Sequence, residues 1–344
     1  MPTVPVAAVV SFRLGGTDGV SIEAAKWCDA LAALGYELVT VAGEGPVDHL
    51  VDGLGIGAAT GPDRPAIERA LEGADLVVIE NLCSLPLNPA AAELVAELCR
   101  GRPAVLHHHD LSWQRPNLGQ APPPDDPDWR HVTINQLSRD QLRAQGIEAV
   151  TIYNRFDTTA SAGDRASTRS ALGISPRDRL FLQPTRALPR KNVGAALALS
   201  EALGATFWLL GPAEDGYGPE LEDLLARCSC PVVLGRAPAD TADAYAASDL
   251  VVLPSVWEGF GNPTVESAVH RRPLVVGPYP VAGELAAFGF RWFSVDDREA
   301  LARWLDRPDP TLLEDNWEVA DTHFSLRDLP ALIAAVLETL PVQF

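Results

Sequence analysis

Two glutamates frame a glycine-rich segment in the second half of the chain. Glu258 and Glu266 are separated by the seven residues Gly-Phe-Gly-Asn-Pro-Thr-Val. The apolar run Leu250–Pro254 precedes them and predicts a buried strand. A strand, a glycine turn and a helix start in this order suit a phosphate, so the segment indicates a nucleotide-sugar site. A purely structural interpretation leaves Glu258 as a loop residue and Glu266 as a solvated acid in a first helical turn.

The turn predicts where the helix begins. Asn262 is a favourable N-cap and Pro263 a favourable first helical residue. We expect free backbone amides from Thr264 onward, with the positive end of the helix dipole, to face an anion. Gly259 and Gly261 would let the backbone approach that anion closely. The turn therefore predicts a phosphate site built largely from main-chain groups.

The overall charge limits the class of partner. The 344 residues carry a formal net charge of −19, spread evenly as −10 over residues 1–157 and −9 over the rest. No basic stripe is present to neutralise nucleic-acid phosphates, so nucleic acid is excluded as an expected partner. The same argument weakens docking on anionic lipids, which needs clustered Lys and Arg beside an apolar face. A soluble protein is expected.

Cysteine usage and the chain start bear on localisation. The five cysteines have neither metal-ligand spacing nor the pattern of a disulfide framework, and they are Cys28, Cys83, Cys99, Cys228 and Cys230. Reduced thiols of a cytoplasmic protein fit this usage. The N-terminus lacks a basic region and a cleavage pattern, and no apolar run has the length of a membrane span. We expect a cytoplasmic chain without a transmembrane segment.

Apolar strand-like runs alternate with helical patterns along the whole chain. A polar stretch at residues 158–170 interrupts the alternation, which then restarts. The pattern predicts an α/β protein with two parallel sheets, the first in a domain of residues 1–157 and the second in a domain of residues 158–325. Apolar residues at helical spacing predict a final helix over residues 326–340. The runs that predict strands are 4–12, 37–42, 75–80, 104–109, 131–135, 150–154, 179–183, 205–211, 231–235, 249–255 and 273–277.

Three consecutive histidines and an aspartate end one of the expected strands. Side chains alternate along a strand, so His107 and His109 are expected on one face and His108 on the other. Neighbouring strand residues cannot all converge on one ion, and no further ligand set is evident, so no metal is expected. For each imidazole, a hydrogen-bonded structural role is the alternative to a role at a site.

Taken together, these segments resemble the retaining glycosyltransferases of family 4. The resemblance spans essentially the whole chain, and its most specific element is the pair Glu258 and Glu266 combined with Arg186 and Lys191. It implies a GT-B architecture, with two facing Rossmann-like domains and a cleft between them. The acceptor would bind mainly to residues 1–157 and the nucleotide sugar mainly to 158–325, while residues 326–344 would pack back on the first domain. The matching segments are Gly15-Gly-Thr-Asp-Gly19, His107-His-His-Asp110, Tyr153-Asn-Arg-Phe-Asp157, Arg186 with Lys191-Asn192, and Glu258 to Glu266.

The resemblance implies roles on the donor side. Arg186 and Lys191 would neutralise the leaving diphosphate in place of a divalent metal. A solvated basic loop is the alternative for this pair, and in particular for Arg190. Glu266 would accept hydrogen bonds from the ribose and Glu258 from the donor sugar, since a carboxylate matches a vicinal diol. Backbone groups of Gly259, Phe260, Gly261 and Thr264 would line the sugar and phosphates.

The first domain carries the remaining candidates. Gly15 and Gly16 would bring backbone amides to the diphosphate or the acceptor, or else form a plain strand-to-helix turn capped by Thr17 or Asp18. The His-x-Asp spacing of the family selects His108 with Asp110, and a shift by one residue selects His109. The proline-rich loop at residues 121–128, with Trp113 and Arg115 nearby, would shape an acceptor groove or simply pack.

The resulting hypothesis is a retaining transfer of a hexosyl group from a nucleotide-diphosphate sugar to an unidentified hydroxyl acceptor. This acceptor is a carbohydrate, a lipid-linked molecule or a small molecule. The acceptor attacks from the face that the diphosphate leaves, so no nucleophile from the protein, metal or other cofactor is required. The paired glutamates are then not the acid and nucleophile of a hydrolase. Alternatives are an epimerase or phosphorylase of the same fold, and a non-catalytic nucleotide-sugar-binding partner. A dehydrogenase is disfavoured because the early glycines lack the Gly-x-Gly-x-x-Gly register.

Overall fold

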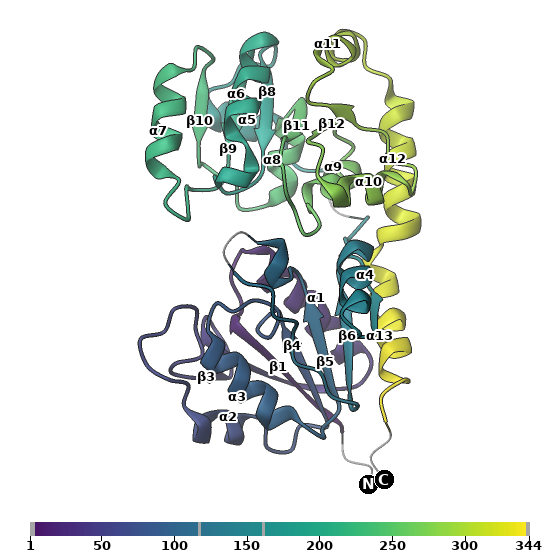
Figure 1. Ribbon diagram of the computed structural model, residues 1–344. Helices are drawn as coiled ribbons and strands as arrows, with labels where there is room; N and C mark the ends of the chain where they lie inside the picture. The colour runs from purple at the N-terminus through teal and green to yellow at the C-terminus, as the bar shows by residue number, and fades with distance from the viewer. Residues whose placement is uncertain (1–3, 116–117, 160–161, 342–344) are drawn as a thin grey trace. The chain divides into compact units, whose positions relative to one another are not determined.

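The computed structural model describes residues 4–115, 118–159 and 162–341 and forms two compact units (Figure 1). The first unit comprises Met1–Arg155 with Leu326–Phe344, and the second comprises Phe156–Ser325. The boundary between residues 155 and 156 lies two residues before the one expected from the polar stretch.

A parallel sheet of seven strands forms the centre of the first unit, in the order β3-β2-β1-β4-β5-β6-β7. The chain reverses its direction of growth between β1 and β4, which makes this point the topological switch of the sheet. Only β3 has no counterpart among the predicted strands, because it has two exposed residues. The strands are β1 (Val6–Arg13), β2 (Glu37–Glu44), β3 (His49–Leu50), β4 (Leu76–Glu80), β5 (Ala104–His108), β6 (Trp129–Thr133) and β7 (Ala149–Thr151).

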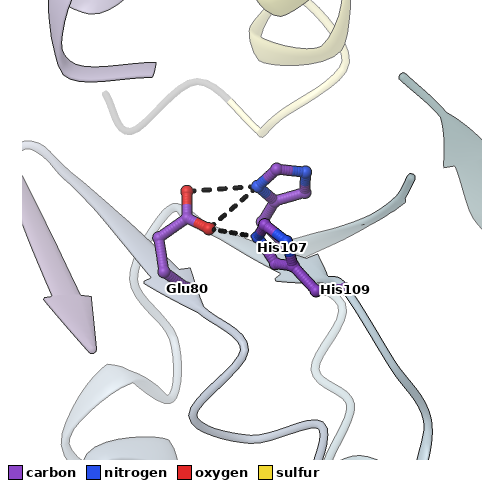
Figure 2. Close-up of side chains that lie close together, drawn as sticks. All are labelled: Glu80, His107 and His109. Atoms are coloured by element: carbon purple, nitrogen blue, oxygen red, sulfur yellow. Dashed lines mark hydrogen bonds and ion pairs between the residues drawn. The ribbon is translucent and has the colours of Figure 1, made fainter. Parts of the chain in front are cut away.

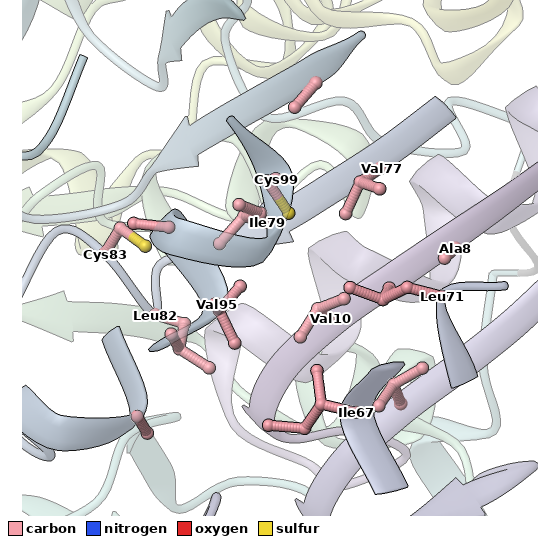
Figure 3. Close-up of a cluster of buried hydrophobic side chains, with 14 of the residues drawn as sticks. Ala8, Val10, Ile67, Leu71, Val77, Ile79, Leu82, Cys83, Val95 and Cys99 are labelled. Carbon is pink, nitrogen blue, oxygen red and sulfur yellow. The ribbon is translucent and has the colours of Figure 1, made fainter. Parts of the chain in front are cut away.

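Helices cover both faces of this sheet, which explains the continuous apolar runs of its strands. One core contains alternate residues of β1 and β4 with residues of α2 and α3, among them Val10, Ile79 and Val95 (Figure 3). On the other face, α1 and α13 pack together, with Trp27 and Leu31 against Ile333 and Val336. The helical segments are α1 (Gly19–Ala33), α2 (Arg64–Ala70), α3 (Pro89–Cys99), η1 (Ser112–Gln114), α4 (Gln136–Ala144), η3 (Leu326–Asp328) and α13 (Leu329–Leu337).

The second unit repeats this plan with six parallel strands in the order β10-β9-β8-β11-β12-β13. Its topological switch lies between β8 and β11. As in the first unit, the strand absent from the predictions, β13, has only two residues. The strands are β8 (Arg179–Gln183), β9 (Ala205–Leu209), β10 (Val232–Leu234), β11 (Leu250–Leu253), β12 (Leu274–Val276) and β13 (Phe293–Ser294).

Part of the polar boundary stretch belongs to a helix of the second unit, not to a linker. Arg169 of α5 is buried and donates to the carbonyl oxygens of Ala247 and Ser175, and it also pairs with Asp249. The polar stretch that marks the expected domain boundary therefore includes a residue that anchors a packed helix. The helices of this unit are α5 (Arg165–Leu172), η2 (Pro189–Lys191), α6 (Val193–Ala202), α7 (Gly218–Arg227), α8 (Thr241–Ala247), α9 (Pro263–Val269), α10 (Pro280–Ala286), α11 (Arg298–Asp306) and α12 (Pro310–Phe324).

In the part of the chain that the structure describes, no helix has both the length and the apolar character that a membrane span requires.

Candidate active site

In each unit, polar residues gather in the loops that follow the two strands at the topological switch. In the second unit, Lys191 lies in the loop after β8, and Glu258 lies in the loop after β11. In the first unit, the glycines at 15 and 16 follow β1, and Glu80 ends β4. Carboxyl ends of parallel strands share one edge of a sheet, and the switch point is where α/β sheets bind ligands.

A buried ion cluster joins the two loops of the second unit. The Nζ of Lys191 donates to Oε1 of Glu258 at 2.5 Å, and Arg190 donates to Oε2 at 2.6 Å. Glu258 is 4% exposed, so burial favours its neutral form, but the two cations outweigh this effect and hold its pKa below the ordinary value. Burial lowers the pKa of Lys191 despite the partner charge. Arg190 is thus part of the cluster, and its interpretation as a solvated loop residue is wrong.

The turn after Glu258 differs in detail from the expectation. Asn262 already has helical dihedral angles, φ −42° and ψ −41°, and its side chain makes no capping hydrogen bond. The amide of Thr264 donates to the carbonyl oxygen of Gly261 at 2.8 Å, and the Thr264 hydroxyl donates to the same oxygen. The predicted helix start at Pro263 is confirmed, but the prediction of a free amide at Thr264 is wrong. The helical hydrogen bonding simply begins one turn earlier.

Two residues of the turn, which the sequence analysis expected to line the ligand, also have structural roles. Gly261 has a φ of +89°, and a Cβ at this position would lie 2.2 Å from the hydroxyl oxygen of Tyr279. Phe260 is 3% exposed and packs near Phe156 and Phe324, with ring centroids 6.0 Å and 6.2 Å away. The side chain of Phe260 is therefore core, and any contact it makes with a sugar comes from its backbone.

The two remaining donor-side candidates bind neighbouring side chains. Glu266 accepts a hydrogen bond at 2.5 Å from the hydroxyl of Tyr245 in α8. Arg186 forms an ion pair with Glu214 at 2.5 Å, and both side chains are partly exposed. Arg186 is near enough to lower the pKa of Lys191 through its charge, although burial is the larger cause. Arg186 and Glu258 thus lie near Lys191, while Glu266 lies in α9, the helix that follows the glycine turn.

In the first unit, the early glycine segment forms a capped turn. Asp18 is the N-cap of α1 and accepts hydrogen bonds from the amides of Val20 and Ser21. Gly15 has a φ of +72°, and a Cβ there would lie 2.6 Å from the ring of Pro46. The capped-turn alternative therefore describes this segment, and it leaves the proposed ligand role of Gly15 and Gly16 as a prediction.

His107 and His109 share one carboxylate, as Figure 2 shows. The Nδ1 of His107 and the Nε2 of His109 each lie 2.9 Å from Oε2 of Glu80. All three side chains are buried, and their ligand atoms, all within 4.8 Å of one another, make this a group that could hold a metal ion. The expected alternation along the strand is confirmed. Glu80 of the neighbouring strand β4 joins two of the histidines as a third ligand group that the sequence did not reveal, and the expectation that no metal binds stays a prediction.

His108 points the other way and lies within a chain of hydrogen bonds. Its Nδ1 lies 2.6 Å from the hydroxyl of Ser84, and its Nε2 lies 2.9 Å from Nδ1 of His131. Nε2 of His131 in turn lies 3.1 Å from the carboxylate of Asp125, on the proline-rich loop. Burial holds the pKa of His108 well below its ordinary value, and it also lowers the pKa of His131. Both ring nitrogens of His108 are thus hydrogen-bonded within the unit, as its structural alternative describes, and its role at the site stays a prediction.

His109 and Asp110 are held at the end of β5 by a neighbouring loop. The side chain of Asn81, which has a φ of +58°, accepts hydrogen bonds from the amides of both residues. Asp110 also pairs with Arg115 at 2.5 Å. Burial lowers the pKa of His109, but the hydrogen bond and charge of Glu80 raise it above the ordinary value. Of the three histidines, His109 has both a raised pKa and a direct neighbour in Asp110, and its role at a site stays a prediction.

Sequence reasoning missed several residues that complete these clusters. A signal was present for Glu80 and Asn81, because these polar residues directly follow the apolar strand residues 76–79. Pairing across strands is not visible in the sequence, so the signal identifies candidates without their partners. The missed residues are Glu80, Asn81, Ser84, His131, Arg190 and Tyr245.

Comparison with known proteins places this geometry in a class. The family of group 1 glycosyl transferases matches residues 191–307, which begin at Lys191 and include the turn from Glu258 to Glu266. The mannosylglucosylglycerate synthase of Thermotoga maritima is 26% identical over 97% of this chain and 99% of its own length. The same enzyme of Petrotoga mobilis is 25% identical over 87% of this chain and 88% of its own length.

The fold also matches solved structures. Anabaena HepE, crystallised in complex with UDP-glucose, is similar with a TM-score of 0.73 over 97% of this chain and 100% of that chain, at 19% identity. The expected GT-B architecture is confirmed. The chain is a transferase enzyme, a glycosyltransferase.

Proposed function

We propose that the chain is a retaining hexosyltransferase of the family 4 type, which uses a nucleotide-diphosphate sugar and a hydroxyl acceptor. One observation carries the proposal. The matched family segment starts at Lys191. The buried contact between Lys191 and Glu258 joins the loops that follow β8 and β11, the two strands at the switch point. A strongly desolvated lysine beside a glycine turn is a suitable site for the charge that develops on a leaving diphosphate.

The donor side would divide its work among the charged residues. Lys191 has three ammonium hydrogens, so it can bind a phosphate oxygen while it keeps its bond to Glu258. Arg186, partly exposed on the same loop, would add a planar fork for a second oxygen. Glu258 would accept from sugar hydroxyls with its remaining lone pairs, and Glu266 from the ribose. Tyr245 would orient the Glu266 carboxylate through the hydrogen bond that it donates.

Charge stabilisation and positioning would then supply the catalysis. As the bond between the sugar and the diphosphate breaks, the sugar gains oxocarbenium character and the phosphate gains negative charge. Lys191 and Arg186 meet that charge, so no metal ion is invoked for the leaving group. The acceptor hydroxyl attacks from the same face, and its proton passes to the departing phosphate. The anomeric configuration is therefore retained.

The relatives suggest which acceptor to test first. Two mannosylglucosylglycerate synthases align with 87% and 97% of the chain. We propose a small glycosylated hydroxy acid as the acceptor class, with glucosylglycerate as its first representative. The N-terminal unit would bind this acceptor and the second unit the nucleotide sugar, as the resemblance implies.

The test is a nucleotide-release assay with purified protein, a panel of UDP- and GDP-hexoses, and glucosylglycerate or other small acceptors. We expect release that depends on both a donor and an acceptor, and a product whose NMR coupling constants show the anomeric configuration of the donor. Release without an acceptor, or conversion of one sugar nucleotide into another, would favour the epimerase or phosphorylase alternatives. An inverted product would contradict retention. Tight nucleotide-sugar binding without any turnover would indicate a non-catalytic partner.

The metal requirement is tested in the same assay. We expect the rate to stay within about twofold after treatment with EDTA, because cationic side chains can supply the charge stabilisation. A rate that collapses with EDTA and returns with Mg²⁺ or Mn²⁺ would contradict the metal-independent mechanism.

A further inference from the structure

Glu80 is a carboxylate buried at the topological switch of the first sheet. It is 0% exposed, and it lies opposite His107 in the pairing of β4 with β5. Burial of a charged carboxylate is costly unless hydrogen-bond donors surround it. His107 and His109 both approach its Oε2 at 2.9 Å and provide these donors (Figure 2). Together they lower the pKa of Glu80 to about 2 against the opposing effect of burial, so the carboxylate is ionised.

The three histidines differ in which of their ring nitrogens have a hydrogen-bond partner. His107 stacks on Trp27 at 4.3 Å, and its Nε2 is buried without a partner among the described residues. Both nitrogens of His108 bind other side chains. His109 is fixed by Glu80 at Nε2 and by Asn81 at its backbone amide, while no described group binds its Nδ1. His109 is therefore the one that has an immobilised ring and an unused nitrogen.

We propose that Glu80 is the positioning residue of His109, holding Nε2 so that Nδ1 meets the substrate in one orientation and one hydrogen-bonding state. This inference rests on the proposed function, in which the first unit binds the hydroxyl acceptor. Glu80 itself touches no substrate in this scheme. It acts through the ring, much as the carboxylate of a catalytic triad acts through its histidine.

Three carboxylates around the ring of His109 raise its pKa against the effect of burial. Glu80 faces it from β4, Glu23 from α1, and Asp110 from the same strand end. The opposing cation Lys26 is bound to Glu23 at 2.5 Å, and burial lowers the pKa of the neighbouring His107. An imidazolium whose Nε2–H is bound by Glu80 presents Nδ1–H, which suits a phosphate or hydroxyl oxygen. With Glu80 replaced by a neutral residue, the effect of burial on the pKa of His109 would dominate. The ring would then lose its proton at Nδ1 and present a lone pair there.

The first experiment compares the full-length protein with Glu80→Gln, Glu80→Asp and a control, Glu68→Gln, on the exposed surface of α2. Glu80→Gln should lower kcat by about 10- to 100-fold, the usual effect of losing a residue that orients a functional side chain. The basic limb of the pH–rate profile should also move to lower pH. Glu80→Asp should recover part of both, and Glu68→Gln should change neither. A merely structural Glu80 would lower the melting temperature without moving the basic limb, which would overturn the proposal.

The second experiment follows the ring without turnover. Imidazole ¹⁵N NMR, with the His109 signals assigned through His109→Gln, should show His109 titrating at lower pH in Glu80→Gln than in the wild type. An unchanged titration would overturn the link between the two residues. Stoichiometric zinc in the purified protein that is lost from Glu80→Gln would overturn it too, because a metal would then hold the ring. If the wild type turns over no donor, only the transferase proposal is contradicted. The NMR titration of His109 still tests whether Glu80 positions the ring.

Discussion

At the scale of single residues, the buried contact between Lys191 and Glu258 serves two purposes that mutations can separate. Each side chain lies in a low-dielectric environment, with 11% and 6% of its surface exposed. Removal of Lys191 alone leaves the buried Glu258 carboxylate with a single cation, whereas replacement of both with neutral groups of similar size leaves only the partly exposed Arg190 without its carboxylate. Stability therefore depends on the pair being matched, while catalysis depends on the ammonium group itself.

We predict that Lys191→Met destabilises the protein by up to about 3 kcal/mol, with Arg190 as the remaining partner of Glu258. The double variant Lys191→Met with Glu258→Gln should regain most of this stability, as measured by urea unfolding. Turnover should fall by about 10²- to 10³-fold in both variants, because neither has the ammonium group that stabilises the diphosphate. Recovered turnover in the stable double variant would contradict the assigned role.

Glu266 gives a second prediction, based on binding. Glu266→Ala should weaken nucleotide affinity by about tenfold or more, the usual effect of losing hydrogen bonds to a charged group. Tyr245→Phe removes only the hydroxyl that orients this carboxylate, so a smaller loss is expected. Isothermal titration with the free nucleotide measures both. Equal affinities of wild type and Glu266→Ala would remove the residue from the ribose site.

At the scale of elements, the turn between β11 and α9 is set by a steric limit. Gly261→Ala should destabilise the protein by more than about 2 kcal/mol, because φ is +89° and a Cβ would meet the Tyr279 hydroxyl at 2.2 Å. Adding Tyr279→Phe should relieve only part of the cost, since the ring carbon Cζ remains 3.1 Å away. Gly283→Ala in the open surface of α10 is the matched control. It should stabilise the protein by about 0.5–1 kcal/mol.

The histidine chain between β5 and β6 predicts a pH dependence. His108 and His131 have lowered pKa values, so the unfolded chain binds protons that the folded chain does not once the pH falls below about 6.5. The free energy of unfolding should therefore fall from pH 7 to pH 5, by up to about 1.4 kcal/mol per pH unit for each proton taken up. His109 has a raised pKa and opposes this trend, because its contribution is fully present at low pH.

Urea unfolding at several pH values measures the slope. A double variant, His108→Gln with His131→Gln, should flatten it, and the exposed His49→Gln should leave it unchanged. A slope that persists in the double variant would place the proton uptake elsewhere.

At the scale of the whole molecule, the two units predict separable responses. Scanning calorimetry with nucleotide at about 100 times its Kd should stabilise the second unit by about 2.7 kcal/mol and leave the first nearly unchanged. Removal of residues 326–344 should lower the stability of the first unit, because Ile333 and Val336 of α13 cover Trp27 and Leu31 of α1. A nucleotide effect on the first unit alone would reverse the assignment of the donor site.

Much of the fold was predictable because it depends on local patterns. Strands buried on both faces require apolar runs, and each predicted run contains a strand or overlaps one. The side-chain alternation that separates His108 from its neighbours is also local. The predictions failed where a residue's environment depends on distant groups, as for Arg190, which Glu258 holds from 68 residues away. The cap at Asn262 failed because the backbone there had already entered the helix.

The sequence by itself determined which chemical groups stand at the strand ends, and that both halves of the chain form parallel sheets. Only the tertiary structure decided which of these groups meet. Strand order puts β4 beside β5, and the register puts Glu80 opposite His107, so a carboxylate and two imidazoles that are 27 and 29 residues away become one cluster. Composition and periodicity act over a few residues, whereas strand order and register act across the whole sheet. The glycine turn was recognisable from the chain alone, but its cationic partners were established by folding.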